Sequence, residues 1–473
     1  MTSRKRTKIV CTLGPATHTL EAIVALADAG MDVCRLNFSH GTHEDHAKLI
    51  GLIHEAREKT GIPLAILQDL QGPKIRVGEL PEGGVRLVAG KEVIFTVGPG
   101  KPPEKIPVSY EELPGDVQPG QVLLLDDGLM SAQVVSVKGK DVVAKVLEGG
   151  DLLSHKGMNL PNTKTSIPAL TDKDREDLRF GVEYKVDWVA LSFVRSPDDV
   201  ALLRSALAEL EDKAGPHIKV MCKIEKPEAL DHLQEIIEAS DGIMVARGDL
   251  GIEMPPEKVP VIQKRIIDAC LKAAKPVIVA TQMLESMIHH PRATRAEVSD
   301  VAHAVMDHAD ATMLSAETAS GEYPREAVKT MAATLLETEK SGYDDRAIEF
   351  DAKANTEGAM TNIASVLAQG HGVKAILVAS LTGQAANLIS RYRPTAPIYA
   401  AAVDERIRNQ LQLSWGVTPV LVPMCRTTPE LIEVSLKRLL EEKQVKTGDE
   451  IVLVAGEPLG ASGSVNMVEL RKV

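Results

Sequence analysis

The chain has 473 residues, a formal net charge of −12 and 44% hydrophobic residues, a length that favours about two to four domains. No basic patch suggests a nucleic-acid partner, and no apolar run reaches the length of a membrane span. The five isolated cysteines indicate a reducing compartment, so we expect a cytoplasmic protein.

The first block alternates strands with helices. Apolar runs predict strands at residues 8–13, 32–38 and 63–70, and helical spacing predicts helices at 19–30 and 43–61. The first helix ends on a glycine, which is typical of a helix C-cap. This pattern is the beginning of a βαβ series.

The pattern changes from about residue 73 to residue 167, where Gly, Pro and Val dominate and helical periodicity is absent. Short alternating runs are separated by turn pairs, which predicts a small antiparallel β domain inserted into the series. The runs are 85–88, 93–97, 122–125 and 142–147, and the turn pairs are Gly83-Gly84, Asp127-Gly128 and Gly149-Gly150.

The βα series resumes at Thr171, and Thr294 with Glu297 forms a plausible capping box. Five more strands bring the total to eight, which predicts a TIM (β/α)8 barrel. The added strands are at 188–193, 219–224, 243–246, 277–280 and 311–314.

A third block with four further strands predicts a C-terminal open α/β domain. Its strands are at 375–379, 397–401, 417–421 and 451–455. The expected division of the chain is 1–72 and 168–342 for the barrel, 73–167 for the inserted β domain and 343–473 for the C-terminal domain.

Polar side chains gather where the predicted barrel strands end, which is where a TIM barrel carries its active site. Arg35, Asn37 and Ser39 alternate along the second strand and would share one wall. The plain alternative is a strand that becomes polar as it leaves the core.

Two carboxylates, Glu225 and Asp249, follow neighbouring strands and could hold a hard cation such as Mg²⁺. Lys223 lies two residues from Glu225, where it would neutralise charge on a transferring phosphoryl group. Asp69 and Thr281 end two other strands. The alternative is that these charges merely pair in the barrel mouth. There is no Walker loop, so scattered basic groups would have to hold a nucleotide.

Several long strings closely resemble those of pyruvate kinases. They are CRLNFSHG at 34–41, MCKIE at 221–225, GIMVARGDLG at 242–251, ATQMLESM at 280–287 and RYRP at 391–394. The resemblance covers nearly the whole chain in order. It implies transfer of the phosphoryl group of phosphoenolpyruvate to ADP, giving pyruvate and ATP, by a homotetramer regulated through its C-terminal domain. It also implies that the inserted β domain is a small β-barrel that closes over the site as a lid.

The resemblance also implies roles for individual residues. Arg35 would grip the phosphoryl group, Lys223 would stabilise the transition state, and Glu225 with Asp249 would hold Mg²⁺, or Mn²⁺ as an alternative. Thr281 would lie on the path by which the enolate is protonated. Substrate-binding positions are Arg35, Lys223, Gly248, Asp249 and Thr281, and nucleotide-binding positions are Asn37, His40, Arg76 and Lys156.

One departure concerns the monovalent cation. Many pyruvate kinases need K⁺ and have a string resembling DTKGPE where this chain has DLQGPK, ending at Lys74. Asn37, Ser39, Asp69 and Leu70 match the cation site. We expect the compact ammonium of Lys74 to supply the positive charge, so that K⁺ is dispensable. The alternative is that Lys74 points to solvent and K⁺ binds as usual.

A second departure concerns regulation. Ser380, Thr382 and Gly383 stand where the family often has a richer phosphate-binding turn, and the Gly- and Ser-rich segment 456–466 could cover it. A phosphorylated effector at this helix N-terminus is the expectation. An ordinary helix cap is the alternative.

Two other functions share part of this pattern. A Mg²⁺-dependent barrel lyase acting on pyruvate enolate would use the same carboxylates without ADP or a lid. A catalytically inactive metabolite sensor would use only the C-terminal domain. The presence of Lys223, Glu225, Asp249 and Thr281 argues against the sensor.

Overall fold

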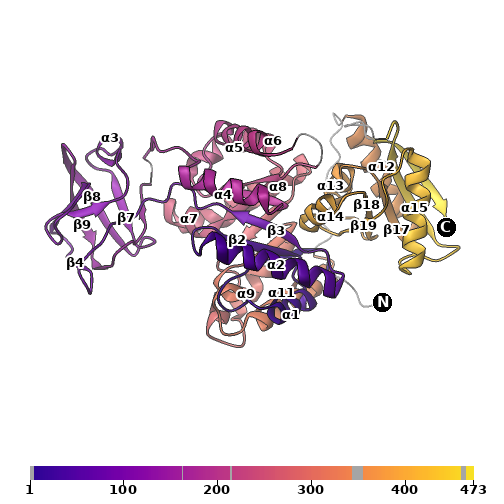
Figure 1. Cartoon of the computed structure of the whole chain (residues 1–473), viewed down its shortest axis with the longest axis horizontal. Helices are drawn as coiled ribbons and strands as arrows, with labels where there is room; N and C mark the ends of the chain where they lie inside the picture. The colour runs from indigo at the N-terminus through magenta and orange to yellow at the C-terminus, as the bar shows by residue number, and fades with distance from the viewer. Residues whose placement is uncertain (1–4, 162, 213–215, 344–354, 460–464) are drawn as a thin grey trace.

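The computed structural model describes residues 5–161, 163–212, 216–343, 355–459 and 465–473. Three bodies lie in a row along its long axis (Figure 1). The central one is a closed barrel of parallel strands, which confirms the predicted fold. Its strands are β1 (Lys8–Thr12), β2 (Val33–Asn37), β3 (Ala65–Asp69), β12 (Trp188–Leu191), β13 (Lys219–Ile224), β14 (Gly242–Ala246), β15 (Val277–Ala280) and β16 (Ala311–Leu314).

Helices surround the barrel, and buried Val10, Met221, Met244, Ile278 and Met313 pack inside it. The interior is therefore a packed core, and polar chemistry is confined to its ends. The capping box of Thr294 and the C-cap at Gly30 are confirmed. The helices are α1 (Leu20–Ala29), α2 (His43–Thr60), α4 (Asp172–Glu183), α5 (Pro197–Leu210), α6 (Leu233–Ala239), α7 (Arg247–Glu253), α8 (Val259–Ala273), α9 (Arg295–Met306), α10 (Ala316–Ala319) and α11 (Pro324–Glu339), with short 3-10 turns η1 (Pro227–Leu230), η2 (Pro256–Lys258) and η3 (Glu285–Ile288).

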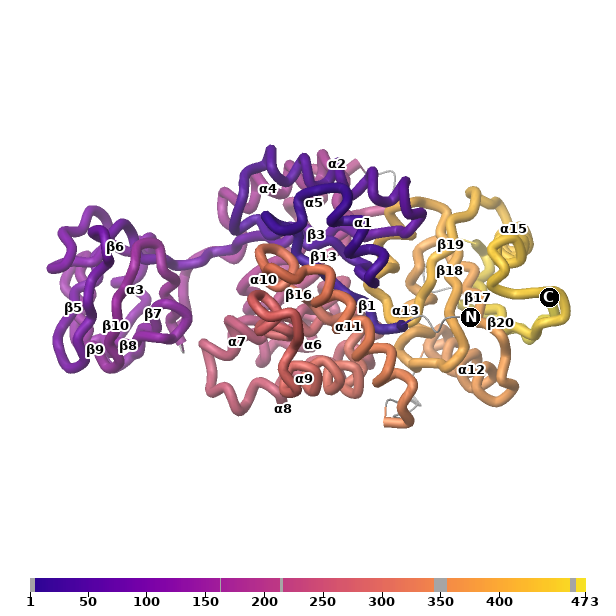
Figure 2. The backbone as a smooth tube through the Cα atoms, turned by 90° about the horizontal axis from the view of Figure 1, so that it is seen from below, coloured from indigo at the N-terminus to yellow at the C-terminus, as the bar shows by residue number. Residues whose placement is uncertain are grey.

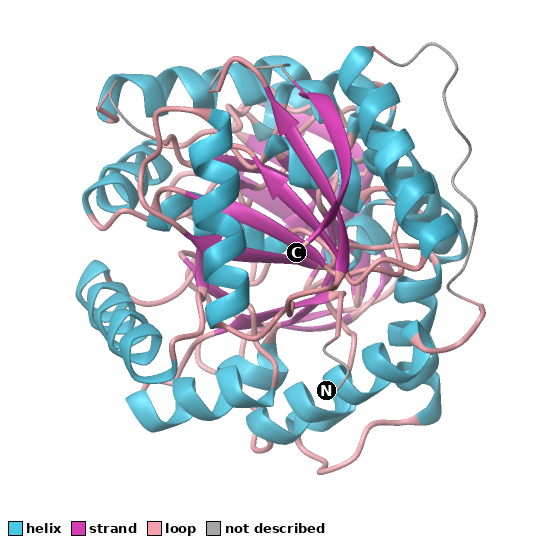
Figure 3. Ribbon diagram, turned by 90° about the vertical axis from the view of Figure 1, so that its right-hand side faces the viewer, coloured by secondary structure: helices cyan, strands magenta, loops and turns pink. Residues whose placement is uncertain are grey.

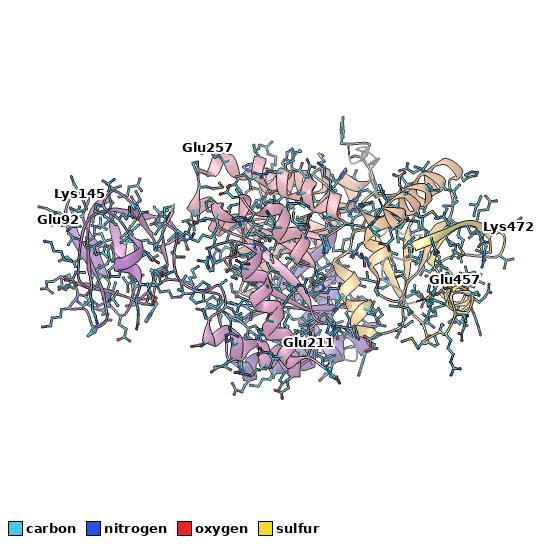
Figure 4. All side chains as sticks on the ribbon, turned by 90° about the horizontal axis from the view of Figure 1, so that it is seen from above. Glu92, Lys145, Glu211, Glu257, Glu457 and Lys472 are labelled. Atoms are coloured by element: carbon cyan, nitrogen blue, oxygen red, sulfur yellow. The ribbon has the colours of Figure 1, made fainter. Side chains whose placement is uncertain are left out.

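The inserted lid stands away from the barrel on a narrow connection (Figure 2). Its strands share one apolar core and form a six-stranded sheet plus the pair β10-β4. They are β4 (Val85–Leu87), β5 (Glu92–Val97), β6 (Ile106–Val108), β7 (Val122–Leu125), β8 (Met130–Lys138), β9 (Asp141–Glu148), β10 (Gly150–Leu152) and β11 (Met158–Asn159), with helix α3 (Leu113–Asp116). Glu92 and Lys145, which pair across β5 and β9, mark its far end (Figure 4).

Of the three predicted turn pairs in the lid, two are correct and one is wrong. Gly83 and Gly84 both have positive φ, and Gly84 N donates to Pro81 O at 2.8 Å in the turn before β4. Asp127-Gly128 lies in the hairpin between β7 and β8, and both residues have positive φ. Gly149-Gly150 is not a hairpin turn, because Gly150 opens β10, which pairs with β4 instead of β9. A Cβ on Gly149 would come within 2.4 Å of Leu87 O, so this glycine is needed for a close strand crossing.

The C-terminal domain is a five-stranded sheet in the order β19-β18-β17-β20-β21 with helices on both faces (Figure 3). The antiparallel edge strand β21 was not predicted. The elements are α12 (Thr356–His371), β17 (Ala375–Ala379), α13 (Gln384–Ser390), β18 (Ile398–Ala402), α14 (Glu405–Gln410), η4 (Leu411–Leu413), β19 (Val417–Leu421), α15 (Thr428–Glu441), β20 (Glu450–Gly456) and β21 (Val465–Lys472).

The C-terminal domain is fixed to the N-terminal end of the barrel by buried polar contacts. Arg393 pairs with Asp310 at 3.0 Å, and Asn409 Nδ2 donates to Asp187 Oδ1 at 3.3 Å. Asp310 and Asp187 each directly precede a barrel strand, so this contact lies opposite the strand ends where the site is expected. Among the described residues, no helix is long and apolar enough to cross a membrane.

Candidate active site

Lys223 lies at the centre of the polar end of the barrel, with its side chain 12% exposed. Its Nζ is 2.8 Å from Ser192 Oγ, 2.9 Å from Glu225 Oε1 and 3.3 Å from Asp69 Oδ1. Burial lowers the pKa of Lys223, but the carboxylates of Asp69 and Glu225 outweigh that effect and raise it. The side chain is therefore a permanent cation in a water-poor site.

Asp69 stands between Lys223 and a second cation, Arg35. Arg35 Nε donates to Asp69 Oδ2 at 2.7 Å, and one terminal nitrogen donates to Thr12 Oγ1 at 2.9 Å. Burial raises the pKa of Asp69, and the two cations reverse this and lower it. The carboxylate stays ionised and holds both cations in place.

The two predicted metal ligands approach Lys223 from neighbouring strand ends. Glu225 Oε2 accepts from Phe193 N at 2.7 Å, while the buried Oε1 lies 2.9 Å from the Lys223 ammonium. Burial raises the pKa of Glu225, Lys223 opposes this, and Asp249 raises it further. Each carboxylate would therefore be stabilised by a cation bound between them.

This donor set fits Mg²⁺. The described residues contain no group of three or more His, Cys, Asp or Glu side chains arranged around one metal position. Two carboxylates alone suit an ion that binds sparsely to protein and keeps positions for water and substrate oxygens.

Thr281 and helix α7 form the adjoining wall. Gly248 N donates to Thr281 Oγ1 at 2.9 Å, and that hydroxyl donates to Ala280 O at 2.7 Å. Thr281 has φ +69°, an outlier for a β-branched residue. Arg247 donates to Thr281 O at 2.7 Å and pairs with Asp300 at 2.7 Å. Arg247 thus holds the strained backbone of Thr281 in place, and such strain is common at functional sites.

The residues expected to bind the nucleotide lie along the mouth and the lid. Burial lowers the pKa of His40, and the nearby cations Arg76, Arg35 and Lys74 lower it further. His40 is therefore neutral near pH 7. Arg76 donates to His155 O at 3.0 Å, and Lys156 pairs with Asp126 at 2.8 Å in the lid.

Lys74 faces one of the two predicted metal ligands, with its Nζ 3.9 Å from Asp249 Oδ1. Of the positions matching a monovalent-cation site, Asn37 Oδ1 accepts from Ser39 N at 3.2 Å and Leu70 O accepts from Ser192 Oγ at 2.7 Å. The ammonium of Lys74 therefore lies beside the carboxylate of Asp249.

Some supporting residues were not predicted. Ser192 and Thr12 follow or end barrel strands, so the strand-end rule would have found them. The stack of Phe38 on His46, with centroids 4.0 Å apart, has no sequence signal. His46 also contacts His40 O at 3.0 Å, so this stack supports the loop that carries Ser39 and His40.

Glu317, in α10 just beyond the end of β16, has a structural role. Its carboxylate accepts from Leu284 N at 3.1 Å and Ser315 N at 2.7 Å. In the C-terminal domain, Gly383 is the N-cap of α13 with φ +75°, and Thr382 Oγ1 accepts from Gln384 N at 3.4 Å. Ser380 precedes this turn. Residues 460–464 of the predicted covering segment lie outside the described residues.

Comparison with known proteins supports one family. A family model described as "Pyruvate kinase, barrel domain" matches residues 4–328, and one described as "Pyruvate kinase, alpha/beta domain" matches residues 358–470. Proteins named pyruvate kinase from Staphylococcus haemolyticus (strain JCSC1435) and Staphylococcus aureus (strain MRSA252) are each 44% identical over 99% of this chain and 80% of their own length. A solved pyruvate kinase structure from Cryptosporidium parvum superposes with TM-score 0.91 at 36% identity, covering 99% of this chain and 96% of that one.

Proposed function

The chain belongs to the pyruvate kinase family, and from this premise we propose that it transfers the phosphoryl group of phosphoenolpyruvate to ADP, giving pyruvate and ATP. The observation that carries the proposal is the ammonium of Lys223, 2.9 Å from Glu225 and 3.3 Å from Asp69. A fixed cation among carboxylates at a barrel mouth suits stabilisation of charge on a transferring phosphoryl group.

Each charged side chain of the site has a role that follows from the sign of its charge. Arg35 binds the phosphoryl oxygens, and Lys223 stabilises the negative charge that develops as the phosphoryl group leaves the enolate oxygen. Glu225 and Asp249 are the residues that would hold Mg²⁺, or Mn²⁺ in its place, and the bound ion would neutralise phosphoryl charge. Gly248 and Asp249 hold the carboxylate end of the substrate, and Thr281 borders the face on which the enolate takes its proton.

The lid completes the nucleotide site. Asn37, His40, Arg76 and Lys156 bind ADP, the last two from the lid and its connection. Transfer to ADP must exclude water, because water would otherwise accept the phosphoryl group. Closure of the lid over the barrel mouth provides that exclusion.

Pyruvate release from phosphoenolpyruvate tests the proposal directly. We expect release only when both ADP and a divalent ion are present, with ATP formed in equal amount. An enolate lyase would release its product without ADP, and a metabolite sensor would release none. Either of those results would refute the assignment.

We further propose that K⁺ is not required, because Lys74 supplies a fixed positive charge where many relatives have a glutamate. Its Nζ lies 3.9 Å from Asp249 Oδ1, close enough to act on the same charges that a bound cation would.

We propose that a phosphorylated effector binds the C-terminal domain at Ser380, Thr382 and the Gly383 amide. Titrating sugar phosphates and AMP at low phosphoenolpyruvate is expected to raise activity with at least one of them, and Thr382→Val is expected to weaken that response. Thr334→Val, in barrel helix α11, is the matched control. A flat response to every compound removes the site.

The remaining expectations are proposals as well. A homotetramer fits family membership, and a cytoplasmic location is supported by five free, buried cysteines. The domain limits 1–72, 73–167, 168–342 and 343–473 are supported by separate apolar clusters in the barrel, the lid and the C-terminal sheet.

A further inference from the structure

A buried carboxylate lies where the lid joins the barrel. Glu253 is the last residue of α7 and is 3% exposed. Its Oε1 accepts from Asn159 Nδ2 at 3.0 Å and pairs with Lys226 Nζ at 2.6 Å. Its Oε2 is buried without a hydrogen-bond partner. One oxygen atom therefore receives both contacts.

The three side chains belong to three functionally different segments. Asn159 is in β11, by which the lid chain returns towards the barrel. Lys226 directly follows Glu225. Glu253 closes the short helix whose first turn contains Gly248 and Asp249. The contact thus joins the lid to both segments that carry the proposed metal ligands.

Other hydrogen bonds show which part of the connecting chain is attached to the lid and which part is attached to the barrel. Met158 N donates to Ile75 O at 2.9 Å, so the outgoing and returning chains of the lid are bonded to each other. Arg195 donates to Thr165 O at 2.8 Å and Ile167 O at 2.9 Å, which holds the later segment to the barrel. Asn159 lies on the lid side of this connection, and its partner Glu253 lies on the barrel side.

We propose that Glu253 is a positioning residue that couples the position of the lid to the carboxylates of Glu225 and Asp249. This inference rests on the proposed function of those two residues. A movement of β11 acts on Glu253 through Asn159. It then reaches Asp249 along α7 and Glu225 through Lys226. By linkage, a divalent ion bound at the carboxylates must bias the lid as much as the lid biases the ion.

Mn²⁺ binding and hydrogen exchange test the coupling without turnover. Free Mn²⁺ is measured by electron paramagnetic resonance, and exchange is followed at the amides of 75–78 and 156–159. In the wild type, Mn²⁺ is expected to slow exchange at these amides. In Asn159→Leu, Mn²⁺ still binds but the exchange no longer responds. In Glu253→Gln, the response is lost and Mn²⁺ affinity falls about five- to tenfold, a common size for coupling between sites.

Two controls separate positioning from simple destabilisation. Glu257→Gln changes the same group at an exposed position in η2 (Figure 4) and is expected to behave as wild type. Glu253→Gln leaves Lys226 buried without its counter-ion, so the double variant Glu253→Gln/Lys226→Met is expected to regain thermal stability without regaining the exchange response.

The coupling is refuted if Mn²⁺ fails to slow hydrogen exchange in the wild type. It is also refuted if Mn²⁺ slows exchange in Asn159→Leu and Glu253→Gln as much as it does in the wild type. Recovery of the response together with stability in the double variant also refutes it. These outcomes are independent of pyruvate formation. A wild type that releases pyruvate without ADP overturns the proposed function instead.

Discussion

Replacing Lys223 by methionine is expected to lower kcat by about a thousandfold or more, the range seen when a cation at a transferring phosphoryl group is removed. The KM for phosphoenolpyruvate is expected to change little, because the charge that Lys223 stabilises develops mainly in the transition state. Steady-state kinetics at saturating ADP and Mg²⁺ measure both quantities. Methionine keeps the length and apolar stem of the side chain, so packing is largely preserved.

Lys219→Met is the matched control, since it makes the same change at the other end of strand β13, where Lys219 pairs with Asp241 at 3.4 Å. Thermal unfolding of both variants separates a catalytic effect from a folding defect. Arg35 still pairs with Asp69 at 2.7 Å, so that carboxylate keeps one partner in Lys223→Met. A variant that loses only substrate affinity would show that Lys223 binds the ground state and has no special part in the transition state.

The geometry changes how Asp69 is interpreted. From the sequence it is a strand-end carboxylate matched to a cation site. In the structure it contacts Arg35 and Lys223 and is 1% exposed. Its lowered pKa means that it keeps its charge beside the two cations that we propose act on the substrate. Asp69 therefore sets the distance between the two positive groups.

The predictable part of the site follows from two short-range rules. Strand periodicity and chain order located the ends of the barrel strands, and polar residues at those ends include Arg35, Lys223 and Asp249. The contact of Glu253 with Asn159 joins residues 94 positions apart. A local pattern cannot report such a contact, because it depends on how the lid connection packs against the barrel.

Strand β8 of the lid is absent from the predicted strands, and its sequence shows why. Its sequence, MSAQVVSVK, has small and polar residues at its start, and its register with β9 shifts twice. Irregular pairing breaks the alternation by which strands are recognised.

Edge strand β21 of the C-terminal domain was also missed from the sequence. Its residues Val465–Lys472 are mostly part-exposed and include several charged side chains, so no apolar face stands out.

Replacing Lys74 by glutamate is expected to create a requirement for K⁺. In a tetramethylammonium buffer without K⁺, the wild type should be fully active, while Lys74→Glu should lose about a hundredfold in kcat/KM, a typical loss for one electrostatic contact at a reacting centre. A carboxylate at this position would add negative charge near Asp249, whose Oδ1 is now 3.9 Å from the Lys74 ammonium. Added K⁺ should restore the variant, because Asn37, Ser39 and Asp69 remain to bind it.

Lys140→Glu is the matched control, since it makes the same change of charge in an exposed turn between β8 and β9. It is expected to be as active as the wild type with or without K⁺. Activation of the wild type by K⁺ of about tenfold or more, already a sizeable part of the roughly hundredfold effect expected from one electrostatic contact at the reacting centre, would show that Lys74 does not replace the ion. Equal activity of Lys74→Glu in both buffers would show that this position carries no charge that the reaction needs. We conclude that Lys74 replaces K⁺ only if Lys74→Glu needs K⁺ while the wild type and Lys140→Glu do not. Only that result shows that the charge at position 74 decides whether the enzyme needs K⁺.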